Sequence, residues 1–272
     1  MVVDGVVYNA TPRGNLKLNK LFVGDIVEVS KNNYGDGFII DSVYERKNTL
    51  KRPPLSNVDQ IVLVLAPVPK PDFLLIDKLI INAKMHNIDV ILVVNKSDVN
   101  NIYNEIFEEY KMVASKIIQT SAVTKDGVTE LINNLKGKFS CFVGQSAVGK
   151  STLLNAINPN INAETGGLSK KIERGKNTTR HSEIYIFDDI LIADTPGFSL
   201  FDLDIEHNDI KYYYPEFENC TCKYLNCNHF NEREEECEVI KNVNAGKINI
   251  NRYTRYKDLF SQSKEKWQNM YR

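Results

Sequence analysis

The fold of this chain is decided by the stretch Gly144-Gln145-Ser146-Ala147-Val148-Gly149-Lys150-Ser151. It matches the phosphate-binding pattern GxxxxGKS, and it lies between an apolar segment and a helical segment, as that pattern requires. Glycine at both ends lets successive backbone N–H groups point at bound phosphates, assisted by the positive end of the following helix. We expect Lys150 to reach the β- and γ-phosphates and the Ser151 hydroxyl to bind Mg²⁺. The predicted nucleotide contacts of this loop are Gly144, Gln145, Ser146, Ala147, Val148, Gly149, Lys150, Ser151 and Thr152.

A second phosphate motif, Asp194-Thr195-Pro196-Gly197, ends the apolar segment Ile190 to Ala193. Asp194 would hold Mg²⁺ through water, and the N–H of Gly197 would meet the γ-phosphate. Between the two motifs, the basic loop Arg174 to Arg180 contains paired threonines, Thr178 and Thr179. One of them would supply a second Mg²⁺ ligand when the loop closes, and the sequence leaves open which one. The alternative is an ordinary basic loop.

The choice of base follows from Asn95-Lys96-Ser97-Asp98, which comes after the apolar segment Val90 to Val94 and matches NKxD. The Asp98 carboxylate can accept hydrogen bonds from both N1–H and the exocyclic amino group of guanine, a donor pair that adenine lacks. Asn95 would tie neighbouring loops together, and the stem of Lys96 would lie along the base. The pair Ser121-Ala122, after the segment Ile117 to Thr120, supplies the second base-contacting loop. The nucleotide is therefore predicted to be GTP or GDP.

The order of these motifs indicates a circular permutation. Ordinary GTPases run phosphate loop, switch threonine, DxxG, NKxD and SA, whereas here NKxD and SA come first. Because the ends of compact domains often lie close together, such rewiring preserves the sheet and the pocket. The fold class is α/β, a circularly permuted P-loop GTPase domain over 55–205, with continuous apolar runs typical of a parallel sheet covered on both faces. The predicted strands are Ile61 to Ala66, Val90 to Val94, Ile117 to Thr120, Phe139 to Val143 and Ile190 to Ala193, and the predicted helices are Phe73 to Met85, Asn101 to Ala114, Gly127 to Leu135 and Lys150 to Ile157.

Two smaller modules flank this domain. Residues 1–50 contain short alternating segments punctuated by turns, which predicts an OB-fold-like β module or barrel. Its strands are expected at Val2 to Asn9, Asp25 to Ser30 and Gly37 to Val43, and Arg46 to Pro54 is expected to be a linker. Residues 206–272 are polar, rich in tyrosine and cysteine, and end in a helical pattern from about Asn251 to Met270.

The cysteines of the C-terminal module predict a metal site. The pattern Cys222-x4-Cys227-x-His229-x7-Cys237 offers three thiolates and an imidazole, which suits a closed, structural tetrahedral Zn²⁺ site. The module has few apolar residues, so metal binding is expected to supply folding energy. Cys220 is a rival for the first ligand position, and incidental or redox-active cysteines are the other interpretations.

Composition limits the remaining function classes. The chain has 272 residues, 42% of them hydrophobic, and a net charge of −1. That charge excludes a uniformly basic nucleic-acid coat, so RNA contacts must come from local patches. Two stretches fit: Lys170 to Arg180, and Lys247 to Arg272, where seven Lys or Arg accompany two acids. A solvated helix face and a mobile loop are the alternative interpretations. Neither a membrane span nor a signal peptide is found, so a cytoplasmic protein without a membrane partner is expected, with a monomer as the default state.

The whole set of motifs resembles the RsgA (YjeQ/YloQ) family, circularly permuted bacterial GTPases that act in late maturation of the small (30S) ribosomal subunit. The resemblance covers nearly the whole chain, and it implies an N-terminal OB-fold, a C-terminal zinc domain, and binding to 16S rRNA in the small subunit. Two departures stand out. The N-terminal module is short for an OB-fold and is expected to lack its first strand. The family commonly has a histidine before the paired threonines, and this chain has Asn177 there, with His181 four residues further on.

Three functions are compatible with the motifs. The first is GTP hydrolysis on the small subunit, the second a GTP-gated rRNA-binding scaffold with negligible turnover, and the third a permuted GTPase acting on the large subunit. Intrinsic hydrolysis is expected to be slow, because Phe198 follows DTPG where Ras-like enzymes place a water-orienting glutamine. Lys150, Ser151, Thr178, Thr179 and His181 are the candidate catalytic residues.

Overall fold

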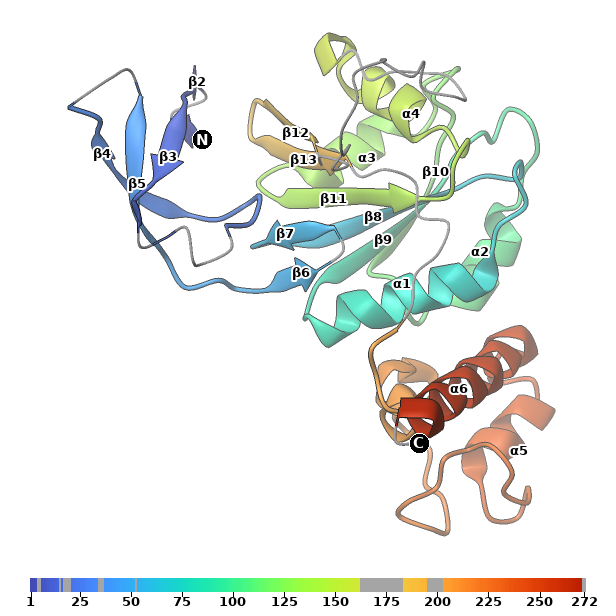
Figure 1. The fold of residues 1–272 in the computed structure, drawn as a ribbon. Coiled ribbons are helices and arrows are strands. Elements are labelled where there is room, and N and C mark those ends of the chain that lie inside the picture. Colours follow the sequence, from blue (N-terminus) through green and yellow to red (C-terminus); the bar gives the residue numbers. More distant parts are fainter. Residues whose placement is uncertain are drawn as a thin grey trace.

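A six-stranded sheet forms the centre of the computed structural model, which describes residues 1–3, 6–14, 16, 21–33, 37–51, 53–161, 183–194 and 203–270 (Figure 1). The strand order is β10-β9-β8-β11-β13-β12, and every neighbouring pair is parallel except β12 and β13. The strands are β8 (Gln60–Leu65), β9 (Asp89–Val94), β10 (Lys116–Gln119), β11 (Phe139–Gly144), β12 (Glu183–Phe187) and β13 (Ile190–Asp194). The five predicted strands are thus confirmed to within about a residue at most ends.

Side-chain alternation along the strands assigns each helix to a face of the sheet. On β8, Ile61, Leu63 and Leu65 pack with α1 (Phe73–Met85) and α2 (Tyr103–Tyr110), whereas Val62 and Val64 pack with the helices of the other face. Those helices are α3 (Val128–Leu135) and α4 (Lys150–Ile157), followed by the short 3-10 helix η2 (Pro159–Ile161). Since successive strand residues point to opposite faces, a strand covered on both sides is apolar throughout. The bounds of α1 and α4 match the prediction, and α2 is shorter than predicted at both ends.

Strand β12 was not predicted, because the predicted strands of this domain were all continuous runs of apolar residues. It pairs antiparallel with β13 at the edge of the sheet, and its side chains alternate between exposed Ile184 and Ile186 and half-buried Tyr185 and Phe187. An edge strand with one face toward solvent is recognised by alternating buried and exposed side chains rather than by a continuous apolar run.

The N-terminal module has a three-stranded sheet of order β3-β5-β4 and a separate hairpin. Its strands are β1 (Val2–Val3), β2 (Val6–Val7), β3 (Ala10–Pro12), β4 (Val27–Lys31) and β5 (Phe38–Val43). The single strand expected from Val2 to Asn9 is wrong, because β1 and β2 pair antiparallel with each other. The expected linker from Arg46 to Pro54 is also wrong in part. It contains β6 (Thr49–Lys51), which pairs with β7 (Pro54–Ser56) and buries Leu50 in the core beside the six-stranded sheet.

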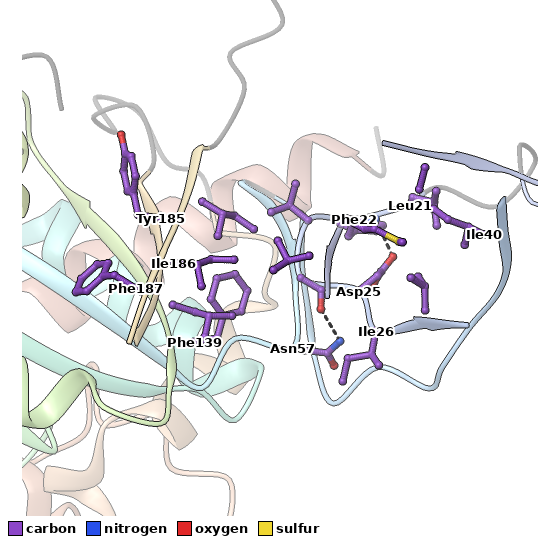
Figure 2. Close-up of a pocket in the computed structure, with 18 of the residues that line it drawn as sticks. Leu21, Phe22, Asp25, Ile26, Ile40, Asn57, Phe139, Tyr185, Ile186 and Phe187 are labelled. Carbon is purple, nitrogen blue, oxygen red and sulfur yellow. Dashed lines mark hydrogen bonds between the residues drawn. The ribbon is translucent and has the colours of Figure 1, made fainter. Parts of the chain in front are cut away.

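A cavity of about 1020 Å³ lies between the N-terminal module and the β12–β13 edge (Figure 2). Figure 2 shows Ile186 and Phe139 on the side of the sheet and Phe22 and Ile26 on the side of the N-terminal module. The cavity lies on the amino-terminal side of β11, since Phe139 is the first residue of that strand. It is therefore separate from the carboxyl edge of the sheet, where the predicted nucleotide motifs lie.

The C-terminal module has a core of its own. It consists of η3 (His207–Tyr213), η4 (Pro215–Phe217), α5 (Glu238–Asn244) and α6 (Ile250–Met270). The expectation of few apolar residues is wrong, because a buried cluster fills the module and includes Tyr214, Phe217, Tyr256 and Phe260. Aromatic rings supply much of this core, and several of them contact edge to face, with Phe217 and Tyr256 centroids 5.0 Å apart. Tyrosine content makes the segment look polar, although the rings of Tyr214, Tyr253 and Tyr256 are buried.

The C-terminal module docks on α1 and α2 through buried charges. Arg252 of α6 is 2% exposed and contacts Asp77 of α1 and Glu216 of η4. Arg255 contacts Asp77 and Glu109 of α2 at 2.7 and 2.6 Å. These two arginines belong to the stretch proposed from sequence as a basic patch, so that interpretation is wrong for them. Within the described residues, no helix is long and apolar enough to span a membrane.

Candidate functional site

The phosphate loop leaves β11 at the carboxyl edge of the sheet and enters α4 (Figure 1). Gly149 has φ 92°, and a Cβ there would lie 2.6 Å from the side-chain nitrogen of Asn95. A Cβ on Gly144 would clash with the carbonyl oxygen of Val64 on the neighbouring strand β8. Both glycines of the motif are thus required by close approach of neighbouring groups, and Gly149 also by its left-handed backbone.

Asn95 joins three of the predicted loops. Its side-chain nitrogen donates to the carbonyl of Val148 at 3.1 Å, and its oxygen accepts from the Thr120 hydroxyl and the Ala122 N–H, both at 3.2 Å. The side chain is buried at 1% exposure, so an unpaired amide would be costly there. The hydrogen bonds hold the phosphate loop and the Ser121-Ala122 loop at a set spacing.

Asp98 and Lys96 extend from the same turn in different directions. Asp98 is exposed, and its carboxylate accepts a hydrogen bond from the Ser121 hydroxyl at 2.6 Å. That bond orients the carboxylate and leaves its second oxygen available. The ammonium of Lys96 donates to the carbonyls of Val68 at 2.8 Å and Ala147 at 2.7 Å, so its stem crosses from the guanine motif to the phosphate loop.

Lys150 and Asp194 form the charged part of the phosphate site. The Lys150 ammonium lies 3.4 Å from the carbonyl of Gly144, the first residue of the loop motif. Burial lowers the pKa of Lys150 from its ordinary value, and the nearby Asp194 carboxylate acts in the opposite direction. The predicted site residues Thr178, Thr179, His181 and Gly197 lie outside the described residues.

The four predicted metal ligands come together in the C-terminal module. The ligand atoms of Cys222, Cys227, His229 and Cys237 all lie within 4.8 Å of one another. The Nδ1 atom of His229 is 3.5, 3.3 and 3.4 Å from the sulfurs of Cys222, Cys227 and Cys237, and the Cys222 and Cys237 sulfurs are 3.8 Å apart. A tetrahedral zinc with ordinary bond lengths requires about 3.5 Å between nitrogen and sulfur and about 3.8 Å between sulfurs. The donor set therefore fits Zn²⁺.

The neutral state of His229 and the contacts of Cys220 agree with this ligand set. Burial raises the pKa of the Cys227 and Cys237 thiols, so these two ionise only with the positive charge of a metal beside them. Burial lowers the pKa of His229 to about 4, with help from Lys211, so the imidazole is neutral, as a ligand must be. Cys220, the rival first ligand, instead accepts a hydrogen bond from the side-chain nitrogen of Asn242 at 3.4 Å. All four donors come from protein, which leaves no open position for water and indicates a structural site.

Comparisons with known proteins agree with this geometry. The model of the RsgA GTPase family matches residues 43–204. The chain belongs to the RsgA GTPase family. It is 38% identical to a protein of Geobacillus sp. (strain WCH70) named small ribosomal subunit biogenesis GTPase RsgA. The alignment covers 97% of this chain and 92% of that protein. It is also 40% identical to a protein with that name from Ruminiclostridium cellulolyticum. That alignment covers 95% of this chain and 87% of the relative.

Two solved structures share the fold of this RsgA family member. The crystal structure of YjeQ from Thermotoga maritima matches with a TM-score of 0.79 and 35% identity, over 94% of this chain and 90% of that one. The crystal structure of YloQ, described as a circularly permuted GTPase, matches with a TM-score of 0.74 and 31% identity, over 94% and 86% of the two chains. The permuted α/β fold and the GTPase family are thereby confirmed. The cluster of Cys222, Cys227, His229 and Cys237 fits a zinc-binding module by its own geometry.

Sequence reasoning missed one group of residues near the RsgA nucleotide motifs. The connection from β8 to α1 is bonded to both recognition motifs, through Val68 to Lys96 and through Asp72 to Gln145, whose side-chain oxygen accepts the Asp72 N–H at 3.0 Å. Neither Val68 nor Asp72 belongs to a GTPase motif. The proline-rich run Pro67 to Pro71 was the available signal, because it predicts an ordered turn after a buried strand.

Proposed function

We propose that this chain hydrolyses GTP to GDP and phosphate in the cytoplasm, as a step in late maturation of the small ribosomal subunit, and that it binds 16S rRNA as a monomer. The names of its relatives support the subunit, since they describe small ribosomal subunit biogenesis GTPases. We propose further that residues 1–50 form an rRNA-binding module and that residues 55–205 form the GTPase domain. Residues 206–272 would form a zinc-binding module.

One observation carries the nucleotide assignment. Asn95, at the end of β9, hydrogen-bonds to the phosphate loop after β11 and to the Ser121-Ala122 loop after β10, so motifs from three strands converge at one edge of the sheet. In α/β sheets, ligands bind outside the carboxyl ends of the strands. Asp98, oriented by Ser121, would accept the two donors of guanine.

The phosphates of the nucleotide would be bound by positive charge and by backbone dipoles. The N–H groups of the loop and the Lys150 ammonium would surround the β- and γ-phosphates, while Ser151 and Asp194 would hold Mg²⁺ directly and through water. When bound, Mg²⁺ neutralises charge that develops on the phosphates. The sequence predicts that Thr178 or Thr179 would add a Mg²⁺ ligand and that Gly197 would add an N–H to the γ-phosphate.

The experiment that tests this proposal is single-turnover GTP hydrolysis by the free protein and by the protein with isolated small or large subunits. GTPases that lack both water positioning and a charge-stabilising finger turn over at about 10⁻⁴ to 10⁻² per second, and a docked partner raises that by about 10³ to 10⁵. We expect slow turnover alone, strong stimulation by small subunits, and no stimulation by large subunits.

Variants separate the candidate functions. Lys150→Ala should abolish stimulated turnover, and His181→Ala should reduce it if that histidine rather than an rRNA group completes the site. Small-subunit binding that depends on GTP without any turnover would instead favour the scaffold. Cosedimentation of a GTP-analogue complex with large subunits alone would contradict the proposed partner.

A further inference from the structure

The side chain of Gln145 makes contacts that phosphate binding does not require. The pattern GxxxxGKS leaves this position free, because backbone groups make the cradle. Gln145 nevertheless extends toward the start of α1, where its oxygen accepts the backbone N–H of Asp72 at 3.0 Å and its nitrogen lies 3.5 Å from the carbonyl of Lys70. The phosphate loop is therefore bonded to a helix that contributes no recognition motif.

The start of α1 is held on both sides. The Asp72 carboxylate caps the helix by accepting the N–H of Leu75 at 3.0 Å, while the Asp72 N–H is bonded to Gln145. The preceding turn is bonded to Lys96 through the carbonyl of Val68, and Lys96 is also bonded to Ala147 of the phosphate loop. Movement of the first turn of α1 would therefore displace both nucleotide-recognition loops.

The same helix carries the main attachment point of the C-terminal module. Asp77 of α1 is fully buried and accepts hydrogen bonds from Arg252, Arg255 and the Tyr110 hydroxyl. It lies five residues after Asp72, which is about 7.5 Å along a rigid α-helix. Ile81, one turn further along, packs in the core of the C-terminal module. Figure 1 shows α6 lying against α1.

We propose that Gln145 is a positioning residue that couples docking of the C-terminal module to nucleotide affinity, by way of Asp72 and helix α1. The inference rests on the proposed nucleotide site. When Arg252 and Arg255 hold Asp77, the first turn of α1 is placed so that Asp72 can bond to Gln145, and the phosphate loop keeps its binding geometry. By thermodynamic linkage, bound nucleotide must stabilise docking by the same factor.

The test is a double-mutant cycle on the full chain, with affinity for a fluorescent GDP analogue as the measurement. Arg255→Gln removes the two ion pairs of Arg255 and should weaken binding by at least about 5-fold, the lower end of ordinary coupling between sites. Gln145→Met keeps the length of the side chain and removes the amide acceptor. In that background, Arg255→Gln should change affinity by less than about 2-fold, because coupled residues are not additive.

Two further variants test whether the hydrogen bond between Gln145 and Asp72 is the contact that carries the coupling. Gln145→Glu retains an acceptor for the Asp72 N–H, so the full effect of Arg255→Gln should return, whatever its charge does to overall affinity. Lys257→Gln removes a cation of α6 that lies near the Phe230 ring and outside the buried ion pairs, and it should leave affinity unchanged. Hydrogen exchange provides a second readout: GDP should slow exchange of α6 amides in the wild type and not in Gln145→Met.

An equal effect of Arg255→Gln with and without the Gln145 amide would overturn the proposal, as would GDP protection of α6 that survives in Gln145→Met. If Arg255→Gln does not fold, Arg255→Lys replaces it, since lysine keeps the charge but cannot reproduce both guanidinium contacts, to Asp77 and to Glu109. Failure of the wild type to bind guanine nucleotides at all would contradict the proposed function and the coupling with it, whereas equal effects of Arg255→Gln in a wild type that binds GDP would contradict the coupling alone.

Discussion

Arg252→Met tests how strongly the buried charges hold the C-terminal module to the GTPase domain. Arg252 is 2% exposed and lies between Asp77 and Glu216, with its guanidinium carbon 5.1 and 4.5 Å from the ring centroids of Tyr110 and Tyr214. Burial alone would lower the pKa of Arg252, but the Asp77 and Glu216 carboxylates hold it above its ordinary value. Methionine preserves much of the packing and removes the charge.

The size of the expected loss of stability follows from the charges that remain buried after Arg252→Met. The described network has two arginines and three carboxylates, and Arg252→Met leaves Arg255 alone to compensate Asp77, Glu109 and Glu216. Removing one partner of a buried ion pair costs about 3–5 kcal/mol. At about 2–4 °C per kcal/mol for a chain of this size, the melting temperature should fall by about 6–20 °C.

The assay is thermal unfolding followed by circular dichroism, with Lys111→Met as the control. Lys111 pairs with Glu108, but both side chains are largely exposed, at 45% and 63%, and such pairs contribute less than about 1 kcal/mol. Adding Asp77→Leu to Arg252→Met should recover part of the loss, because it removes one uncompensated carboxylate. A loss for Arg252→Met as small as that of the control would refute the reasoning.

Three other outcomes are expected. Asp98→Asn should lose GTP affinity by about 10⁴-fold and gain affinity for xanthosine triphosphate, measured by competition binding, and unchanged GTP affinity would exclude the base-site assignment. Cys227→Ala should lose the single zinc and loosen the cysteine loops, while guanine-nucleotide binding persists because the apolar core of the module remains; full zinc content by metal analysis would contradict the ligand set. Burial alone would raise the pKa of Asp25, but hydrogen bonds from Arg46, the Phe22 N–H and Ser56 hold it below its ordinary value. Asp25 therefore stabilises the fold above about pH 4, and this contribution is lost as pH falls through the lowered pKa; the urea midpoint of Asp25→Asn should approach that of the wild type toward pH 3, and a pH-independent gap would argue against it.

Contiguous motifs were predictable from the sequence because each of them is a local chemical requirement. The phosphate loop needs its two glycines where Asn95 and the carbonyl of Val64 approach, and both are evident from spacing alone. The zinc ligands lie within sixteen residues, so their geometry is nearly local. Helices α1 and α4 follow from apolar periodicity and from adjacent motifs, and the permutation follows directly from motif order.

Tertiary structure decided the features that depend on distant partners. Arg252 and Asp77 are 175 residues apart in sequence, and an arginine in a basic helical stretch looks the same whether it faces solvent, RNA or a buried carboxylate. The aromatic core of the C-terminal module was hidden for a similar reason, since a tyrosine is polar or apolar according to where its hydroxyl finds a partner, as Tyr253 does at the carbonyl of His229. Burial is a property of the assembled chain, because the free energy of a charge or a ring depends on what surrounds it and not on its sequence neighbours.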